Sequence, residues 1–90
     1  MSAKQAQRVL VVDDEEPILE LLRYNLEKNG YEVKTASDGI KAVEIAKKFT
    51  PDLVLLDIMM PKMDGVETCR QLRDLPDLQS TFIIFLTARS

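Results

Sequence analysis

Residues 9–14 read Val-Leu-Val-Val-Asp-Asp, a short run of β-branched and leucine side chains that ends on two acids. Such a continuous apolar run is typical of a strand in a parallel sheet, because helices cover both of its faces. Residues 53–57, Leu-Val-Leu-Leu-Asp, repeat the pattern, and residues 82–86 are apolar up to Thr87. These three stretches predict three strands of one parallel sheet.

A helix and a further strand are expected between the first two of these stretches. Pro17 suits the first helical position and Gly30 suits the stop, and apolar residues recur at helical spacing between them. Residues 31–35 then alternate, with Glu32 and Lys34 on one side. This alternation predicts a half-exposed strand at the edge of the sheet.

Two more helices are expected after the edge strand. Asp38 can cap a helix that runs to Phe49, and Asp64 can cap a third helix. The third helix is expected to turn three side chains inward, those of Val66, Cys69 and Leu72. Strands and helices that alternate in this way are joined by right-handed crossovers, so the predicted fold class is α/β with a doubly wound parallel sheet.

Composition limits the range of functions. Ninety residues suit a single domain, and a formal charge of −3 argues against nucleic acid binding by this segment. The polar tail of residues 1–7 lacks a signal-peptide core and no apolar run reaches membrane-spanning length, so we expect a cytoplasmic location without membrane contact. Cys69 is the single cysteine and histidine is absent, which excludes an intrachain disulfide, histidine-dependent hydrolysis and most zinc chemistry.

Reactivity must then come from carboxylates at strand ends. Asp13 and Asp14 follow the first apolar run, Asp57 ends the second, and a threonine follows the run at 82–86. In an open α/β sheet such strand ends line the crevice where ligands bind. Crowded carboxylates need protons or a cation, and an oxygen-only ligand set with room for water suits Mg²⁺. A carboxylate beside Mg²⁺ can attack a phosphoryl group, so we expect an acyl phosphate on Asp57 with help from the Thr87 hydroxyl.

Plainer interpretations of the same residues stay open. Asp13 and Asp14 could simply begin a loop and cap the following helix, since acidic caps are common. Thr87 could satisfy a backbone group at the end of its strand. Cys69 is expected to be a small core residue without chemistry. An acid at the end of a buried strand is harder to explain in this way, because its desolvation must be compensated, and this favours a functional role for Asp57.

Three motifs in this order resemble the response-regulator receiver family. They are VVDD at residues 11–14, LDIMMPKMDG at residues 56–65 and LTA at residues 86–88. The resemblance covers nearly the whole chain and implies a receiver domain over residues 8–90 with the flavodoxin-like strand order 2-1-3-4-5. It implies a two-component signalling switch rather than an enzyme, with a sensor histidine kinase as the phosphate donor. Within the second motif, Gly65 is expected to relax the backbone as the third helix begins.

The resemblance also implies roles for individual residues. Asp57 corresponds to the phosphoacceptor, Asp14 to a direct Mg²⁺ ligand and Asp13 to a ligand that acts through water. The backbone carbonyl of Met59 corresponds to a further metal ligand, and Thr87 corresponds to the switch hydroxyl.

The family pattern continues beyond the residues of this chain. Receiver domains go on with a fourth helix, a fifth strand carrying a lysine that contacts the phosphoryl group, and a fifth helix. We therefore expect a domain cut short after the strand at 82–86, whose bare apolar edge could pair two copies into a homodimer. Many family members carry a DNA-binding output domain after the receiver, so the parent protein is expected to control transcription.

Three other classes of function compete with the signalling switch. A Mg²⁺-dependent phosphatase with an aspartate nucleophile uses the same parts, but it usually has a second acid where Met59 stands. A nucleotide-binding domain would need a glycine-rich phosphate loop after the first strand, and none is present. An inert, self-associating fragment would need neither metal nor phosphate. The signalling switch is the hypothesis that the motifs favour.

Overall fold

The computed structural model describes residues 6–60 and 63–86, and within them strands and helices alternate as predicted. The elements are β1 (Arg8–Val12), α1 (Glu16–Lys28), β2 (Glu32–Ala36), α2 (Gly39–Phe49), β3 (Leu53–Asp57), α3 (Gly65–Arg73), a short 3-10 helix η1 (Pro76–Leu78) and β4 (Phe82–Leu86). None of the described helices is both long and apolar enough to cross a membrane.

The helix boundaries follow the capping residues that the sequence indicated. The Asp38 side chain caps α2 by accepting a hydrogen bond from the Lys41 amide at 2.8 Å. The Asp64 side chain caps α3 in the same way, through the Glu67 amide at 2.9 Å. The chain leaves α1 through Gly30, whose positive φ of 94° is a conformation that glycine adopts at little cost.

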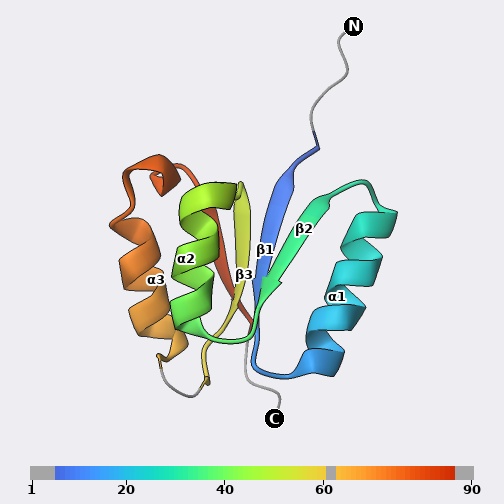
Figure 1. The fold of residues 1–90 in the computed structure, drawn as a ribbon, viewed down its shortest axis with the longest axis horizontal. Helices are drawn as coiled ribbons and strands as arrows, with labels where there is room; N and C mark the ends of the chain where they lie inside the picture. Colours follow the sequence, from blue (N-terminus) through green and yellow to red (C-terminus); the bar gives the residue numbers. More distant parts are fainter. Residues whose placement is uncertain (1–5, 61–62, 87–90) are drawn as a thin grey trace, which may run out of the picture.

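The described strands form one parallel sheet with the order β2-β1-β3-β4 (Figure 1). The predictions of a doubly wound parallel sheet and of an edge position for β2 are confirmed. The order equals the first four places of the 2-1-3-4-5 arrangement. Val12 at the end of β1 pairs with Leu56 of β3. The segments that follow these two strands therefore leave the sheet at the same rim.

Helices cover both faces of this sheet (Figure 1). Alternate residues of β1 serve the two faces, since side chains along a strand point to opposite sides. Leu10 and Val12 belong to the core beneath α2 and α3, whereas Val9 and Val11 pack against α1. All four are fully buried. The continuous apolar run that opened the sequence is explained by this double coverage.

The inward face of α3 differs from the prediction. Val66 is 63% exposed, and the buried residues of α3 are Gly65, Thr68 and Leu72. Cys69 is half-buried and packs against the core, as expected. Thr68 can be buried because its hydroxyl donates to the Asp64 carbonyl at 2.8 Å. A polar residue with an internal partner thus takes the place that the apolar pattern assigned to Val66.

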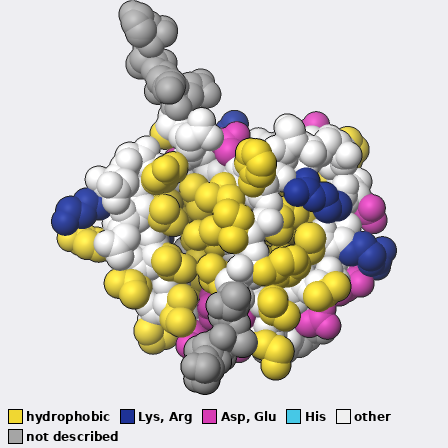
Figure 2. Space-filling model, turned by 180° about the vertical axis from the view of Figure 1, so that it is seen from behind, with side chains coloured by type: hydrophobic (Ala, Val, Ile, Leu, Met, Phe, Trp, Pro, Cys, Tyr) yellow, Lys and Arg dark blue, Asp and Glu magenta, His cyan; other side chains and the backbone are white. Residues whose placement is uncertain are grey.

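The described helices leave much of β4 uncovered. Phe82, Ile84 and Phe85 are 73%, 51% and 36% exposed. Phe82 and Ile84 pair with Leu53 and Leu55, which pack on the α1 side of the sheet. Figure 2 shows the hydrophobic side chains gathered on this side of the molecule. The expectation of a bare apolar edge is met within the described residues.

Candidate functional site

Three aspartates converge at the rim where β1 and β3 end. Asp57 is the last residue of β3, and Asp13 and Asp14 directly follow β1. Each of the three offers a carboxylate oxygen, and these oxygens all lie within 4.8 Å of one another. The parallel register of β1 and β3 produces this convergence, because it places the residues after Val12 beside the end of β3. The structure therefore brings together the acids that the strand-end argument singled out.

Backbone amides hold two of these carboxylates in place. The Glu15 amide donates to Asp13 Oδ1 at 2.9 Å, and the Met59 amide donates to Asp57 Oδ1 at 3.2 Å. The N-cap of α1 is Glu15, with no capping hydrogen bond from its side chain. The interpretation of Asp13 and Asp14 as caps of this helix is therefore wrong.

The buried carboxylates are short of compensating charge. Asp13 and Asp57 are only 5% and 6% exposed, whereas Asp14 faces solvent. Burial raises the pKa of Asp13, the Glu15 amide opposes this effect, and the nearby charges of Asp57, Asp14 and Glu15 raise the pKa further. Among the described lysines and arginines, none forms an ion pair with these aspartates. A bound cation would therefore stabilise the cluster by compensating its negative charge.

The chemistry of this donor set fits Mg²⁺. All three side chains offer oxygen, and the described part of the chain contains no histidine or cysteine ligand beside them. Hard divalent cations prefer such oxygens, and the exposure of Asp14 leaves space for water in the coordination sphere.

A cleft of about 260 Å³ adjoins the acids on the α1 side of the sheet. It is lined by Asp13, Glu15, Ile18, Leu21, Leu22, Asp57 and Leu86. Leu86 is in register with Asp57 and is the last described residue. Thr87, which follows it, lies outside the described residues, so the structure does not place the expected switch hydroxyl. A ligand in this cleft would meet carboxylates at one end and leucine side chains of α1 at the other.

Met59 and Gly65 contribute to the site through their backbones. The Met59 side chain is 63% exposed, and it is the Met59 amide that contacts Asp57. A β-carbon on Gly65 would collide with the Asp57 carbonyl oxygen and lie 2.6 Å from Ile58 Cα. Gly65 does not have a positive φ. The expectation that Gly65 relaxes the backbone is therefore wrong: glycine is needed there because α3 starts in contact with the backbone at the end of β3.

The fold and this acidic rim define a protein of the receiver class, and the comparison with known families agrees. The model of the response regulator receiver domain matches residues 9–90, so the chain belongs to this family. A particular relative is the alkaline phosphatase synthesis transcriptional regulatory protein PhoP of Bacillus subtilis (strain 168). It is 58% identical over 67 residues, a match that covers 74% of this chain and 28% of the relative. The chain thus spans under a third of the length of that regulator.

Solved structures support the same conclusion. Chemotaxis protein CheY4 of Vibrio cholerae superposes with a TM-score of 0.90 at 35% identity, over 94% of this chain and 71% of the other. A second similar structure is the receiver domain of a sensor histidine kinase from Pseudomonas aeruginosa PAO1, which has a magnesium ion coordinated in its active site cleft. It superposes with a TM-score of 0.86 at 32% identity, over 93% of this chain and 69% of the other. The N-terminal domain of a response regulator receiver protein from Methanoculleus marisnigri JR1 superposes with a TM-score of 0.85 at 40% identity, over 91% of this chain and 67% of the other.

Proposed function

We propose that Asp57 accepts a phosphoryl group and that Mg²⁺ bound by Asp13, Asp14 and Asp57 assists the transfer. The observation that carries this proposal is the convergence of three carboxylates within 4.8 Å, two of them buried and none paired with a described cation. Such a cluster is costly unless a cation joins it. When bound, Mg²⁺ neutralises charge on the phosphoryl oxygens. The Met59 carbonyl is the further metal ligand in this proposal, and Thr87 is the hydroxyl that contacts the phosphoryl group.

The residues of the site suit a nucleophilic carboxylate. The Met59 amide holds Asp57 Oδ1, which leaves Oδ2 free to attack phosphorus. With a phosphohistidine donor, a P–O bond to Asp57 forms as the P–N bond breaks, and the histidine nitrogen of the donor leaves with the bonding electron pair. These 90 residues contain no histidine, so a phosphohistidine donor must lie outside them. We infer that the donor is a sensor histidine kinase and that this chain works in the cytoplasm.

The output of the switch is a second part of the proposal. Residues 8–90 form the receiver unit and residues 1–7 a polar tail. The similarity to a transcriptional regulatory protein supports control of transcription by a DNA-binding region outside these residues. The receiver itself binds no nucleic acid and acts as a switch rather than an enzyme in this proposal. The apolar, exposed side chain at Met59 disfavours the phosphatase alternative, which usually has an acid there.

We also propose that two copies of the chain pair through β4. The two edges of the sheet differ: β2 carries Glu32 and Lys34, whereas β4 carries no charged residue. Charged side chains protect an edge strand against pairing, and apolar ones do not. Antiparallel pairing of β4 around Ile84 would bury Phe82 of each copy and extend the sheet across both.

Incubation with acetyl phosphate and Mg²⁺, followed by intact-mass measurement, tests phosphorylation. The wild-type chain should gain the mass of one phosphoryl group, and Asp57→Asn should gain none. Asp64→Asn is the matched control, since Asp64 is another acid of the same loop whose side chain caps α3. It should be phosphorylated like the wild type. A mass gain in Asp57→Asn would place the chemistry on another residue.

A further inference from the structure

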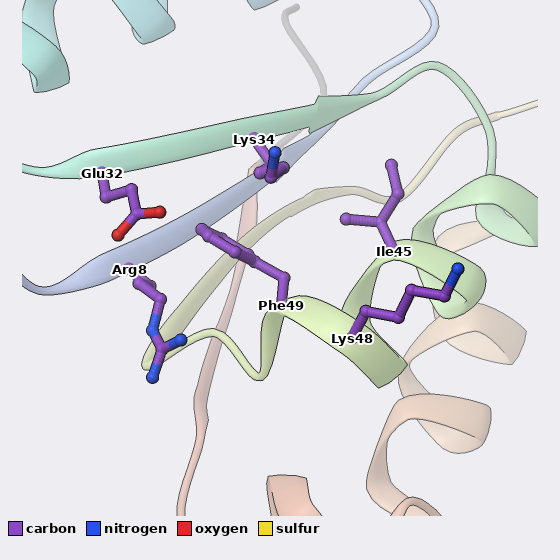
Figure 3. Close-up of a pocket in the computed structure, with 6 residues that line it drawn as sticks. All are labelled: Arg8, Glu32, Lys34, Ile45, Lys48 and Phe49. Carbon is purple, nitrogen blue, oxygen red and sulfur yellow. The ribbon is translucent and has the colours of Figure 1, made fainter.

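A hollow lies at the opposite rim of the sheet from the aspartates. It measures about 470 Å³ and is lined by Arg8, Glu32, Lys34, Ile45, Lys48 and Phe49. Figure 3 shows that Arg8, Glu32 and Lys34 come from the first two strands, and that the others come from α2. Arg8 begins β1, whereas Asp13 follows its end, so the two sites are roughly 17 Å apart along the strand.

The cations around this hollow have no acidic partners. Among the described residues, Arg8, Lys34 and Lys48 form no ion pair. The Arg8 guanidinium and the Lys34 ammonium instead lie 5.9 Å and 5.8 Å from the centre of the same Phe49 ring (Figure 3). A cation–π contact offsets less positive charge than an ion pair does, so an anion in the hollow would gain attraction from both side chains.

The floor of the hollow is apolar. Phe49 is only 6% exposed, and Ile45 adds an aliphatic wall beside it. A ligand that only carried charge would leave this surface unused. A ligand with a compact apolar body could cover Ile45 and the edge of the Phe49 ring while its anionic groups meet the cations.

The frame that carries these side chains is held by hydrogen bonds. The Arg8 amide donates to Asp52 Oδ2 at 2.8 Å, and the Asp52 amide donates to the Arg8 carbonyl at 2.8 Å. α2 ends directly after Phe49, where Thr50 has a left-handed φ of 44° and its hydroxyl donates to the Phe49 carbonyl at 2.7 Å. A site whose backbone is held before binding loses less entropy when a ligand arrives.

From these features we infer a binding site for a small organic dianion with an apolar body, either a phosphate monoester or a dicarboxylate. The lining carries three cations and one carboxylate, Glu32, so its formal charge of +2 matches two negative charges. The carboxylate of Glu32 also disfavours more highly charged anions. This inference does not depend on the phosphoacceptor role of Asp57, because its residues are separate.

Titration of the ¹⁵N-labelled chain, without divalent ions, tests the site with two probes. These are phenyl phosphate and isophthalate, and inorganic phosphate is the anion without an apolar body. The backbone amides of Arg8, Lys34 and Phe49 should shift together and saturate with either or both probes. Phenyl phosphate loses its second charge near about pH 6, so its binding should weaken on acidification to about pH 5.5, whereas isophthalate binding should persist. Tighter binding of one probe would favour its chemical class, phosphate monoester or dicarboxylate, as the ligand class of this site.

Matched variants decide whether the shifts report this site. Lys34→Gln with Lys48→Gln should weaken binding roughly fivefold or more, because both removed charges lie on the rim. Lys41→Gln with Lys47→Gln removes the same charge from exposed positions of α2 outside the hollow and should change binding less than about twofold. The inference is overturned by the absence of saturable shifts, by equal binding in the Lys34/Lys48 variant, or by inorganic phosphate binding as tightly as phenyl phosphate.

Discussion

The ionised form of the buried Asp13 carboxyl group is destabilised by burial and by the neighbouring acids. Its pKa is raised by burial and by neighbouring acids, so the folded chain holds this proton more tightly than the unfolded chain does. Stability therefore falls as pH rises from the ordinary value of 3.8, and the loss is complete above the folded-state pKa. Above that pKa and without Mg²⁺, the ionised form of Asp13 destabilises the fold.

Asp13→Asn should remove this penalty, because asparagine keeps an acceptor for the Glu15 amide and cannot ionise. Without Mg²⁺ at neutral pH, we expect a gain of about 1 kcal/mol, or roughly 4–8 °C in Tm for a domain of this size. The gain should vanish below about pH 3.5. Thermal unfolding followed by circular dichroism measures both. Asp77→Asn, an exposed acid in η1, is the control and should leave Tm almost unchanged. A gain of the same size at both pH values would contradict this account.

Gly65 tests whether close contact or backbone freedom requires glycine. Gly65→Ala should lower stability by about 2 kcal/mol or more, because its β-carbon must displace the backbone of Asp57 and Ile58, and it should also weaken Mg²⁺ binding. Gly30→Ala is the matched control. It has open space around it and a positive φ, so it should cost about 1 kcal/mol and leave Mg²⁺ binding unchanged. Equal effects of both variants on Mg²⁺ binding would refute the contact argument.

At the scale of elements, α3 depends on its Asp64 cap, which lies in the loop between β3 and α3. Asp64→Ala removes the hydrogen bond to the Glu67 amide and should cost about 1 kcal/mol, whereas Asp64→Asn keeps an acceptor and should cost much less. Neither variant should change the Mg²⁺ concentration at half-saturation by more than about twofold, since the Asp64 side chain serves the helix. Chemical denaturation and Mg²⁺ titration separate the two effects. A large loss of Mg²⁺ affinity in Asp64→Asn would assign this acid to the metal site.

The uncovered strand β4 has a different test. Ile84→Lys places a charge at the centre of the proposed pairing edge and should convert a dimer into a monomer in sedimentation velocity. Ile40→Lys is the control, because Ile40 is 49% exposed on α2 while Ile84 is 51% exposed. It should leave the dimer intact. A wild-type chain that sediments as a monomer at high concentration would rule out pairing through β4.

At the scale of the whole molecule, Mg²⁺ binding should be linked to folding. A ligand that binds only the folded state stabilises it by an amount that grows with concentration, about 1.4 kcal/mol at ten times the dissociation constant. We therefore expect the Tm of the wild-type chain to rise steadily with Mg²⁺. In Asp57→Asn the rise should be much smaller, because one of the three carboxylates is lost. A wild-type Tm that does not change with Mg²⁺ concentration would contradict the proposed metal site.

Much of this architecture was predictable, because runs of apolar residues indicate buried strands and capping residues indicate helix starts. The apolar runs at 9–12 and 53–56 marked strands covered on both sides, and Asp38 and Asp64 marked helix starts through side-chain chemistry. The prediction that Val66 points inward was wrong, because an apolar pattern does not show that the Thr68 hydroxyl can find a hydrogen-bond acceptor at the start of α3. The strand order came from the family resemblance, since no local signal specifies which strands pair.

Some features of the candidate site were likewise predictable from the sequence, and others were not. Convergence of the acids followed from the rule for parallel strand ends, and the residue types alone favoured Mg²⁺. The Met59 amide and the contact at Gly65 depend on the path of one loop in three dimensions, which spacing does not specify. The hollow around Phe49 joins residues from β1, β2 and α2, and single-residue patterns do not show such a meeting.

The aspartates at one rim and the cations Arg8, Lys34 and Lys48 at the other contribute an electric dipole moment along the strands. An approaching protein with a positively charged surface is turned toward the acidic pole before any contact is made, and the torque weakens as ionic strength rises. Occupancy of the acidic pole by a divalent ion would shrink this moment. The encounter rate with a cationic partner should therefore depend on the metal as well as on salt.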